Sequence, residues 1–266
     1  MRTTASGLQI EGVHKSFDHR GTRQHVLRGV DLEVKTGEFI SFIGHSGCGK
    51  STLLNVVGGL LAPDSGRVTL DGVTVRSPGP DRAMVFQNYS LLPRMSLLDN
   101  VRTAVCSARV ERGRIHAAEL SEKYLRAVGL WEARNKRPGQ VSGGMQQRAA
   151  VARAFAVEPR VLLLDEPFGA LDALTRGRLQ QQLISLWQSE SETEMVLMVT
   201  HGIEEAIRLA DRIVVMAPSP QPSVMEIIDV DLPRPRDPVQ VVEDPRFRVV
   251  QERLMKLLTD EEHVAA

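Results

Sequence analysis

A short apolar segment, a glycine-rich loop and a helix-forming segment follow one another in the first quarter of the chain, and this order strongly constrains the fold. Residues Phe39 to Ile43 are predicted to form a buried strand, and residues from about Ser51 to Leu60 a helix that Pro63 ends. The loop between them, Gly44 to Ser51, reads GHSGCGKS and fits the pattern G-x-x-x-x-G-K-S/T. Its glycines let backbone N–H groups point at phosphate oxygens, and the helix N-terminus adds its dipole. The segment therefore predicts an α/β fold with a phosphate-binding loop.

Two side chains of this loop have their own predicted chemistry. Lys50 would place its charge on the β- and γ-phosphates of a nucleotide, and the hydroxyl of Ser51 would ligate Mg²⁺. The other nucleotide contacts that we expect here are Gly44, His45, Ser46, Gly47, Cys48, Gly49 and Thr52. The alternative is a chance glycine loop, and the strand–loop–helix context argues against it.

Strand-like and helix-like segments alternate along most of the chain. Further strands are predicted at residues 8–13, 30–34, 83–86, 161–164, 195–200 and 213–216, with a hairpin arm at 66–75 that turns at Asp71-Gly72. Further helices are predicted at residues 96–109, 115–128, 145–157, 171–188, 203–209 and 245–258. The middle helices have no strand between them, which indicates a helical subdomain inserted at about residues 88–140. We expect one domain over residues 8–235 and a helical tail over 236–266.

The composition limits the functional classes. The 266 residues contain 33 Lys+Arg and 33 Asp+Glu, so no basic excess argues for nucleic-acid binding. The two cysteines, Cys48 and Cys106, do not make a disulfide scaffold and indicate a reducing compartment, hence the cytosol. The start shows no signal peptide, and the most apolar stretch, Leu53 to Ala62, is too short to cross a bilayer. At a membrane, another chain would have to hold this one.

A second apolar strand delivers two carboxylates. Val161 to Leu164 are all apolar, and Asp165 and Glu166 follow directly. Asp165 would hold Mg²⁺, directly or through water, and Glu166 would polarise an attacking water. The alternative is a solvated Asp-Glu turn, which becomes the weaker interpretation beside the phosphate-binding loop.

The segment Val141 to Arg148 reads VSGGMQQR and resembles the signature sequence of ABC-type ATPases, usually LSGGQQQR. Ser142 and the N–H groups of Gly143 and Gly144 could receive a γ-phosphate at a second helix start. Because the first loop already occupies one side of the nucleotide, this signature would close over ATP held by another subunit. The resemblance therefore implies an ATP-sandwich dimer, with itself or with a paralogous ATPase. The alternative is a helix N-cap with glycines for tight packing.

Four single residues match positions of the same family. Gln87 matches the glutamine that contacts Mg²⁺ and the attacking water, and His201 matches the switch histidine that reaches the γ-phosphate and orients Glu166. Asp172, in the segment Gly169 to Asp172, matches the loop that contacts the opposite subunit, and Phe17 matches the aromatic residue that stacks on adenine. The alternatives are an exposed Gln, a structural His, a helix N-cap and a packing Phe.

The resemblance covers about Leu8 to Ala217 and implies both fold and activity. The expected fold is a P-loop NTPase core of the ABC ATPase type, with an antiparallel β subdomain and an inserted α-helical subdomain. The implied cofactors are ATP and Mg²⁺. ATP binding would close two subunits, and Glu166 with His201 would activate water for in-line attack on the γ-phosphate.

Several segments resemble the importer ATPases of the nitrate, sulfonate, taurine and bicarbonate group, namely residues 44–50, 78–82, 84–93, 165–172 and 232–236. His45 and the run FQNYSLLP favour nitrate, with nitrite and cyanate as related solutes. The resemblance implies a polytopic permease, a solute-binding protein and a peripheral position on the cytoplasmic side of the inner membrane. Because no further solute-binding-like domain follows, we expect a stand-alone ATPase subunit. Two positions depart from the group: Arg94 stands where Trp is usual, and Gly202 where Asp is usual.

Other functions remain open at this point. A sulfonate or taurine importer would use the same ATPase, because that subunit never touches the solute. A soluble ABC ATPase of DNA repair or translation would usually show two cassettes, coiled coils, zinc motifs or basic arms, and none is visible. A binding module without turnover would be favoured by loss of Lys50 or Glu166, and both are present.

Overall fold

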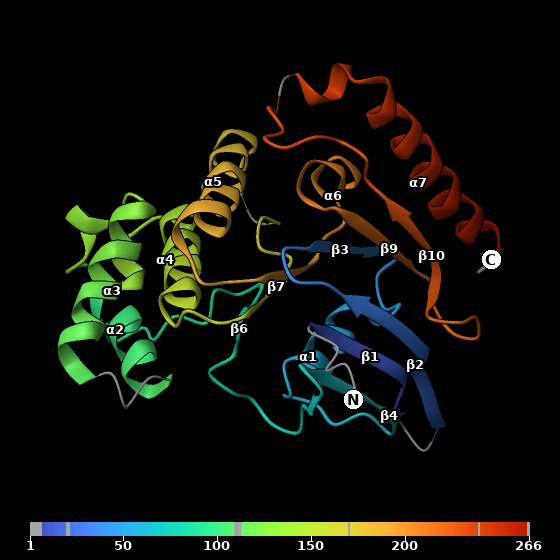
Figure 1. The fold of residues 1–266 in the computed structure, drawn as a ribbon, viewed down its shortest axis with the longest axis horizontal. Helices are drawn as coiled ribbons and strands as arrows, with labels where there is room; N and C mark the ends of the chain where they lie inside the picture. The colour runs from blue at the N-terminus through green and yellow to red at the C-terminus, as the bar shows by residue number, and fades with distance from the viewer. Residues whose placement is uncertain (1–6, 20–21, 109–112, 170, 239, 265–266) are drawn as a thin grey trace, which may run out of the picture. The chain divides into compact units, whose positions relative to one another are not determined.

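The computed structural model describes residues 7–19, 22–108, 113–169, 171–238 and 240–264. The chain divides into two compact units (Figure 1). The first unit comprises Met1–Pro78 and Met195–Ala266, and the second comprises Gly79–Glu194.

The first unit contains a four-stranded antiparallel sheet. Its strands are β1 (Leu8–His19), β2 (Thr22–Val34), β4 (Ser65–Leu70) and β5 (Val73–Thr74), in the order β2-β1-β4-β5. The predicted hairpin is confirmed, because Asp71 and Gly72 turn between β4 and β5 with φ of 50° and 77°. The Asp71 carboxylate also accepts a 3.0 Å hydrogen bond from the N–H of Gly7.

A parallel set of strands forms the other layer of the first unit. Strand β3 (Phe39–Gly44) lies between β8 (Met195–Val199) and β9 (Arg212–Met216) and runs parallel to both, while β10 (Val224–Asp229) pairs antiparallel with β9. Every residue of β3 and β8 is buried. Continuous apolar strands of this kind are typical of parallel sheets that are covered on both faces.

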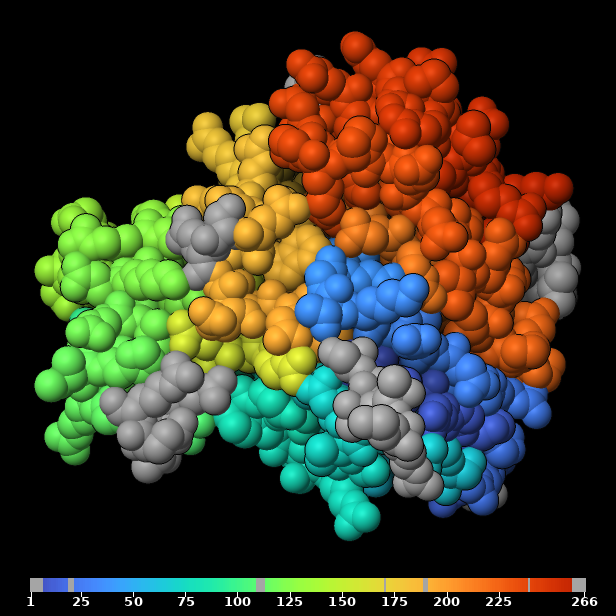
Figure 2. All heavy atoms as spheres, in the orientation of Figure 1, coloured from blue at the N-terminus to red at the C-terminus, as the bar shows by residue number. Residues whose placement is uncertain are grey.

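Three α-helices belong to the described part of the first unit: α1 (Lys50–Val57), α6 (Ile203–Leu209) and α7 (Pro245–Val264). A 3₁₀ turn, η5 (Val241–Glu243), precedes α7. Helix α7 packs against α6, and Arg253 on it forms an ion pair with Glu226 of β10, 2.6 Å from nitrogen to oxygen. In the space-filling view the C-terminal residues, red, lie on the surface beside β10, orange (Figure 2).

The second unit is mainly helical. Strand β6 (Arg82–Val85) pairs in parallel with β7 (Val161–Asp165). Its helices are α2 (Leu97–Ala108), α3 (Gly113–Ala127), α4 (Gly143–Ala156) and α5 (Ala173–Ser185), followed by a π-helical turn η4 (Leu186–Glu190), with 3₁₀ turns η2 (Trp131–Ala133) and η3 (Pro138–Gln140). Helices α2, α3 and α4 pack against one another, and the rings of Tyr124 and Phe155 stack with centroids 6.2 Å apart.

The structure differs from the sequence prediction in a few places. Strand β10 was not predicted, and β1 continues to His19 instead of ending at Val13 because bulges keep it paired with β2. Helix α1 ends at Val57, with Gly58 as its C-cap and Gly59 following at φ of 72°, and α7 runs on to Val264. The predicted helix over residues 96–109 ends at Ala108, and Arg109 lies outside the described residues.

Among the described residues, Cys48 and Cys106 are not joined in a disulfide. Within the described ranges, none of the helices combines the length and the hydropathy that a membrane span requires.

Candidate nucleotide-binding and catalytic site

The phosphate-binding loop lies in the first unit, between β3 and α1, as the sequence predicts. Gly44 has φ of 154°, and a Cβ atom there would lie 2.2 Å from the Met216 carbonyl oxygen. Gly49 has φ of 103°, and a Cβ atom there would lie 2.9 Å from the Val26 carbonyl oxygen. At these two positions the path of the loop therefore requires glycine.

Lys50 is buried, and its side chain folds back along the loop. The ammonium Nζ donates hydrogen bonds to the carbonyl oxygens of Gly44 and His45, at 2.7 and 2.9 Å, and lies 3.7 Å from Cys48 Sγ. Ser51 and Thr52 follow in the first turn of α1 and are partly exposed. The loop thus combines a fixed cation with the N-terminus of a helix, an arrangement suited to binding phosphate.

The remaining loop residues differ in exposure. Ser46 and Gly47 are exposed, His45 is partly exposed, and Cys48 is buried. The His45 imidazole Nε2 lies 2.8 Å from the Leu258 carbonyl oxygen of α7, so the C-terminal helix reaches this loop within the first unit.

The predicted carboxylates lie at the end of β7 in the second unit. Asp165 is the last residue of the strand, and Glu166 follows with φ of 47°, a left-handed conformation that is costly for a residue other than glycine. Glu166 Oε2 accepts a 2.9 Å hydrogen bond from the side-chain amide Nε2 of Gln87. The structure therefore brings together two residues that were predicted separately, although 79 positions separate them in the chain.

The signature segment begins helix α4. Ser142 is the N-cap, and its hydroxyl accepts a 3.3 Å hydrogen bond from the Met145 N–H. Ser142 and Gly143 are exposed, whereas Gly144 packs so closely that a Cβ atom there would lie 2.9 Å from Thr175 Cγ2. Ser142 therefore caps α4, and Ser142 and Gly143 remain accessible to a ligand.

Asp172 is likewise an N-cap, at the start of α5. Its carboxylate accepts a 3.0 Å hydrogen bond from the Thr175 N–H, and this bond lowers the pKa of Asp172. The carboxylate is exposed. Ala170, which belongs to the same predicted segment, lies outside the described residues.

His201 and Phe17 lie in the first unit. His201 comes two residues after the end of β8 and is exposed. Phe17 lies on β1 with 42% of its surface exposed, and Lys15 Nζ is 5.7 Å from its ring centroid. An exposed ring on a strand can stack on a planar base.

The hydrogen bonds of Arg153 were not predicted from the sequence. From α4, its guanidinium donates hydrogen bonds to the carbonyl oxygens of Tyr89 and Ser90, at 3.0 and 2.6 Å, two residues with φ of 61° and 46° in the loop after Gln87. Burial lowers the pKa of Arg153. The available signal was a charged residue in the alanine-rich sequence of α4, where such a residue needs polar partners.

The predicted Mg²⁺ ligands Ser51, Gln87 and Asp165 offer a hydroxyl, an amide and a carboxylate oxygen. Hard oxygen donors of this kind suit Mg²⁺, which is usually held by few protein groups together with phosphates and water.

Comparisons with known proteins agree with these features. A family model described as ABC transporter matches residues 27–169. The nitrate import ATP-binding protein NrtD of Synechococcus elongatus is 47% identical over 251 residues, which cover 94% of this chain and 91% of that protein. The bicarbonate transport ATP-binding protein CmpD of the same species is 48% identical over 240 residues, covering 90% and 86%.

A solved structure shows the same fold. It is the dimeric post-hydrolysis state of the ATP-binding cassette MJ0796 bound to ADP and Pi, with a TM-score of 0.74 and 30% identity over 85% of this chain and 99% of that chain. The predicted ABC ATPase fold is thereby confirmed. The chain belongs to the ABC transporter family, in which it is an ATPase with the fold of the ATP-binding cassette.

Proposed function

We propose that this ATPase couples ATP binding and hydrolysis in a sandwich dimer to the uptake of a small oxyanion, with nitrate as the first candidate. The observation that carries the hydrolytic part is the hydrogen bond between Gln87 and Glu166, whose carboxylate follows β7 directly on a left-handed backbone. Such a fixed carboxylate can take a proton from water as the water attacks a phosphoryl group.

Different residues of the chain would bind the phosphates, the base, Mg²⁺ and the attacking water. Lys50 and the backbone N–H groups of residues 44–49 would bind the phosphates, and Phe17 would stack on the base. Ser51, Gln87 and Asp165 would hold Mg²⁺, which supplies charge stabilisation to the phosphates when bound. Glu166 would receive the proton of the attacking water, and His201 would contact the γ-phosphate and orient Glu166.

The dimer supplies the second side of the site. The exposed Ser142 and Gly143, with Gly144, would donate N–H and hydroxyl groups to the γ-phosphate bound by another cassette. The exposed Asp172 would lie at the same subunit contact. The dimeric ADP-bound and Pi-bound structure of MJ0796, at 30% identity, supports this assembly, formed either by two copies or with a paralogous ATPase.

The proposed partners are a polytopic permease and a solute-binding protein, which would hold the ATPase at the cytoplasmic face of the inner membrane. The similarity to NrtD over 94% of this chain supports nitrate, and the similarity to CmpD supports bicarbonate as the second candidate. The equal numbers of acidic and basic residues give no support to a nucleic-acid partner.

Co-purification tests the proposal. The subunit would be purified from its native membrane, the accompanying chains identified, and ATPase activity of the assembly measured with nitrate, bicarbonate and taurine. A Lys50→Ala variant would serve as the control without phosphate binding. We expect a polytopic permease, and ATP hydrolysis stimulated by nitrate together with the solute-binding protein. Recovery of soluble partners alone, with stimulation by nucleic acid, would contradict the transport function.

A further inference from the structure

Helix α6 is the short element that begins directly after His201 and Gly202. It has seven residues, and its N-cap Gly202 makes no side-chain capping hydrogen bond. A helix of two turns is marginal by itself, so its position depends on tertiary contacts, namely the packing of its buried residues Ala206, Ile207 and Leu209 and the polar contacts at its ends. Those ends are held by two polar groups outside the predicted site.

The N-terminal end of α6 is held by hydrogen bonds of the residues beside His201. The Thr200 hydroxyl donates a short hydrogen bond to Glu205 Oε2 and accepts a 3.0 Å hydrogen bond from the Gly202 N–H. The residues on both sides of His201 are therefore joined to each other and to the first turn of α6. Thr200 is buried, which protects these hydrogen bonds from water.

Residue 202 gives Glu205 a particular importance in this chain. Gly202 has no side chain, and a Cβ atom there would lie 3.2 Å from Glu205 Cβ. Because glycine at position 202 offers no carboxylate, the carboxylate that accepts a hydrogen bond from Thr200 comes from Glu205, within α6.

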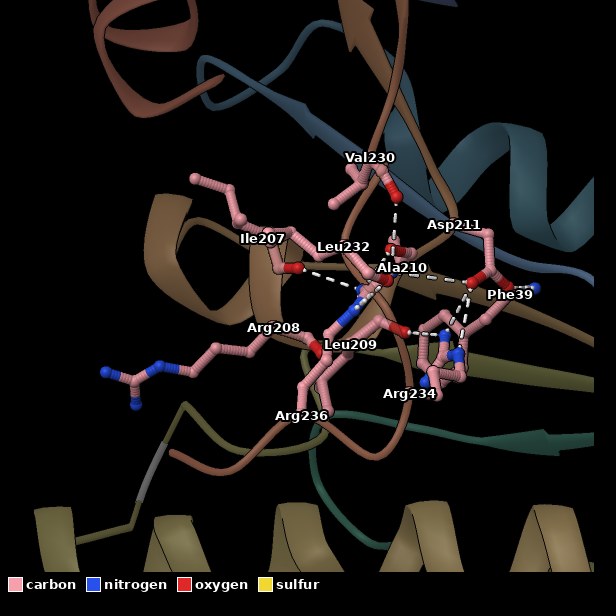
Figure 3. A network of polar contacts seen from close by, with 10 residues as sticks. All are labelled: Phe39, Ile207, Arg208, Leu209, Ala210, Asp211, Val230, Leu232, Arg234 and Arg236. Carbon is pink, nitrogen blue, oxygen red and sulfur yellow. Dashed lines mark hydrogen bonds and ion pairs between the residues drawn. The ribbon is translucent and has the colours of Figure 1, made fainter. Parts of the chain in front are cut away.

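The C-terminal end of α6 is held by Arg236, which Figure 3 shows beside the last residues of the helix. Its side chain is only 3% exposed. Its Nη1 donates to three carbonyl oxygens at the end of α6, those of Ile207, Arg208 and Ala210, at 3.0, 3.3 and 2.5 Å. The rest of the guanidinium donates to the carbonyl oxygens of Val230 and Leu232. Carbonyls at a helix C-terminus lack intrahelical partners, and a cation there is favourable.

A neighbouring ion pair connects this end to strand β3. Arg234 donates to Asp211 Oδ1 through Nε and Nη2, at 3.1 and 2.9 Å, and Asp211 Oδ2 accepts a 2.9 Å hydrogen bond from the Phe39 N–H. Phe39 begins the strand that ends in the phosphate-binding loop. Burial, followed by the nearby charge of Arg234, lowers the pKa of Arg236 to about 10. The group remains a cation at neutral pH.

We propose that α6 fixes the position of His201, and that Glu205 and Arg236 are positioning residues that hold the two ends of this helix. We call their contacts the clamp. The inference rests on the proposed role of His201 in ATP hydrolysis. Neither residue needs to touch the nucleotide, because each fixes the backbone from which the imidazole projects. Small displacements of a catalytic group are costly to the rate, so the clamp should affect turnover more than ATP binding.

The test measures kcat and KM for ATP in the full-length chain. In Glu205→Ala and Thr200→Val we expect kcat to fall about tenfold or more, while KM stays within about twofold. Glu205→Gln should retain most of the activity, because its amide oxygen still accepts a hydrogen bond from Thr200. The matched control is Glu204→Ala, which removes an exposed neighbour on the same turn that pairs with Arg208 at 3.0 Å, and it should leave kcat unchanged.

Arg236→Lys keeps the charge but replaces a planar group of five donors by an ammonium with three, so it should also lower kcat at constant KM. His201→Ala is measured beside these variants. If His201→Ala is slow and Glu205→Ala has the wild-type kcat, the clamp is refuted and the proposed function stands. If His201→Ala itself has the wild-type kcat, the proposed role of His201 fails first. A rise in KM with unchanged kcat in Glu205→Ala would place Glu205 in nucleotide binding and also overturn the inference.

Discussion

At the scale of single residues, glycines determine where the phosphate-binding loop can run. Gly44 and Gly49 have positive φ and approach backbone carbonyl oxygens, whereas Gly47 has positive φ with open space around it. A side chain at Gly44 or Gly49 would therefore collide with the backbone, and at all three positions the positive φ disfavours any residue other than glycine.

Gly49→Ala should lower both Tm and ATP affinity. The new Cβ would lie 2.9 Å from the Val26 carbonyl oxygen, and φ of 103° is strained for alanine by about 1–3 kcal/mol. Thermal unfolding and equilibrium ATP binding would measure the two effects. Gly139→Ala is the control, because a Cβ atom there meets nothing within 4 Å. Equal Tm and affinity in both variants would contradict this account of the loop.

Asp64 should make the stability of the first unit depend on acid pH. Its carboxylate lies 2.9 Å from Lys15 Nζ and 2.7 Å from the Ser16 N–H, and chiefly the hydrogen bond with Lys15 lowers the pKa of Asp64 to about 2. A lowered folded-state pKa stabilises the fold above the ordinary carboxyl pKa, and this gain is lost as the pH falls through about 2.

Urea unfolding of the wild type and Asp64→Asn at pH 7 and pH 3 would test this. We expect the variant to be less stable at pH 7 and the difference to narrow at pH 3. A difference that stays constant between the two pH values would show that the carboxylate charge is not involved.

Residue roles were predictable where a local pattern specifies them. Lys50 and Ser51 belong to one continuous loop motif, so their placement after β3 follows from the sequence. Arg153, Glu205 and Arg236 were not predicted, because their partners are carbonyl or hydroxyl groups brought near by the path of the chain. The hydrogen bond between Gln87 and Glu166 was not predicted, because the resemblance relates each residue to the attacking water and not to the other.

At the scale of elements, the strands with continuous apolar sequences were the most predictable. Strands β3, β7 and β8 were located within one residue at each end, because nearly all of their residues are buried. Strand β10 was missed because its sequence does not alternate between apolar and polar residues, since Met225 and Ile227 are exposed while Glu226 is partly buried, and because it lies between proline-rich segments. Its partner β9, rather than its own sequence, defines it as a strand.

Helix α5 contains a glycine that nothing in its surroundings requires. A Cβ atom at Gly177 would meet nothing within 4 Å, and the residue lies inside the helix Ala173–Ser185. Gly177→Ala should therefore stabilise the protein by about 0.5–1 kcal/mol, because alanine is the better helix former. Thermal unfolding measures the gain. A lower Tm than the wild type would mean that this helix position needs the freedom of glycine.

At the scale of the whole molecule, the proposed transport function requires the ATPase to pass its conformational change to a membrane partner. Arg94 is exposed in the second unit, and the exposed apolar residues Leu92 and Met95 lie close to it in sequence. Apolar side chains around a charge on the surface are typical of a contact with another protein.

Arg94→Ala should reduce solute-stimulated ATP hydrolysis in the assembled transporter more than basal hydrolysis of the isolated subunit. The residue lies outside the proposed nucleotide site, so the basal rate should stay near that of the wild type. Arg102→Ala, an exposed arginine on α2, is the matched control and should change neither rate. An equal loss of both rates in Arg94→Ala would place Arg94 away from the coupling surface.

Glu166 is proposed to take the proton of the attacking water in a dimer that ATP closes. The direct measurement uses Glu166→Gln with ATP and Mg²⁺, following phosphate release and molecular mass in solution together. We expect the variant to bind ATP, accumulate as a dimer and release almost no phosphate, because the amide cannot take the proton of the attacking water. Phosphate release at the wild-type rate from Glu166→Gln would contradict this role of Glu166.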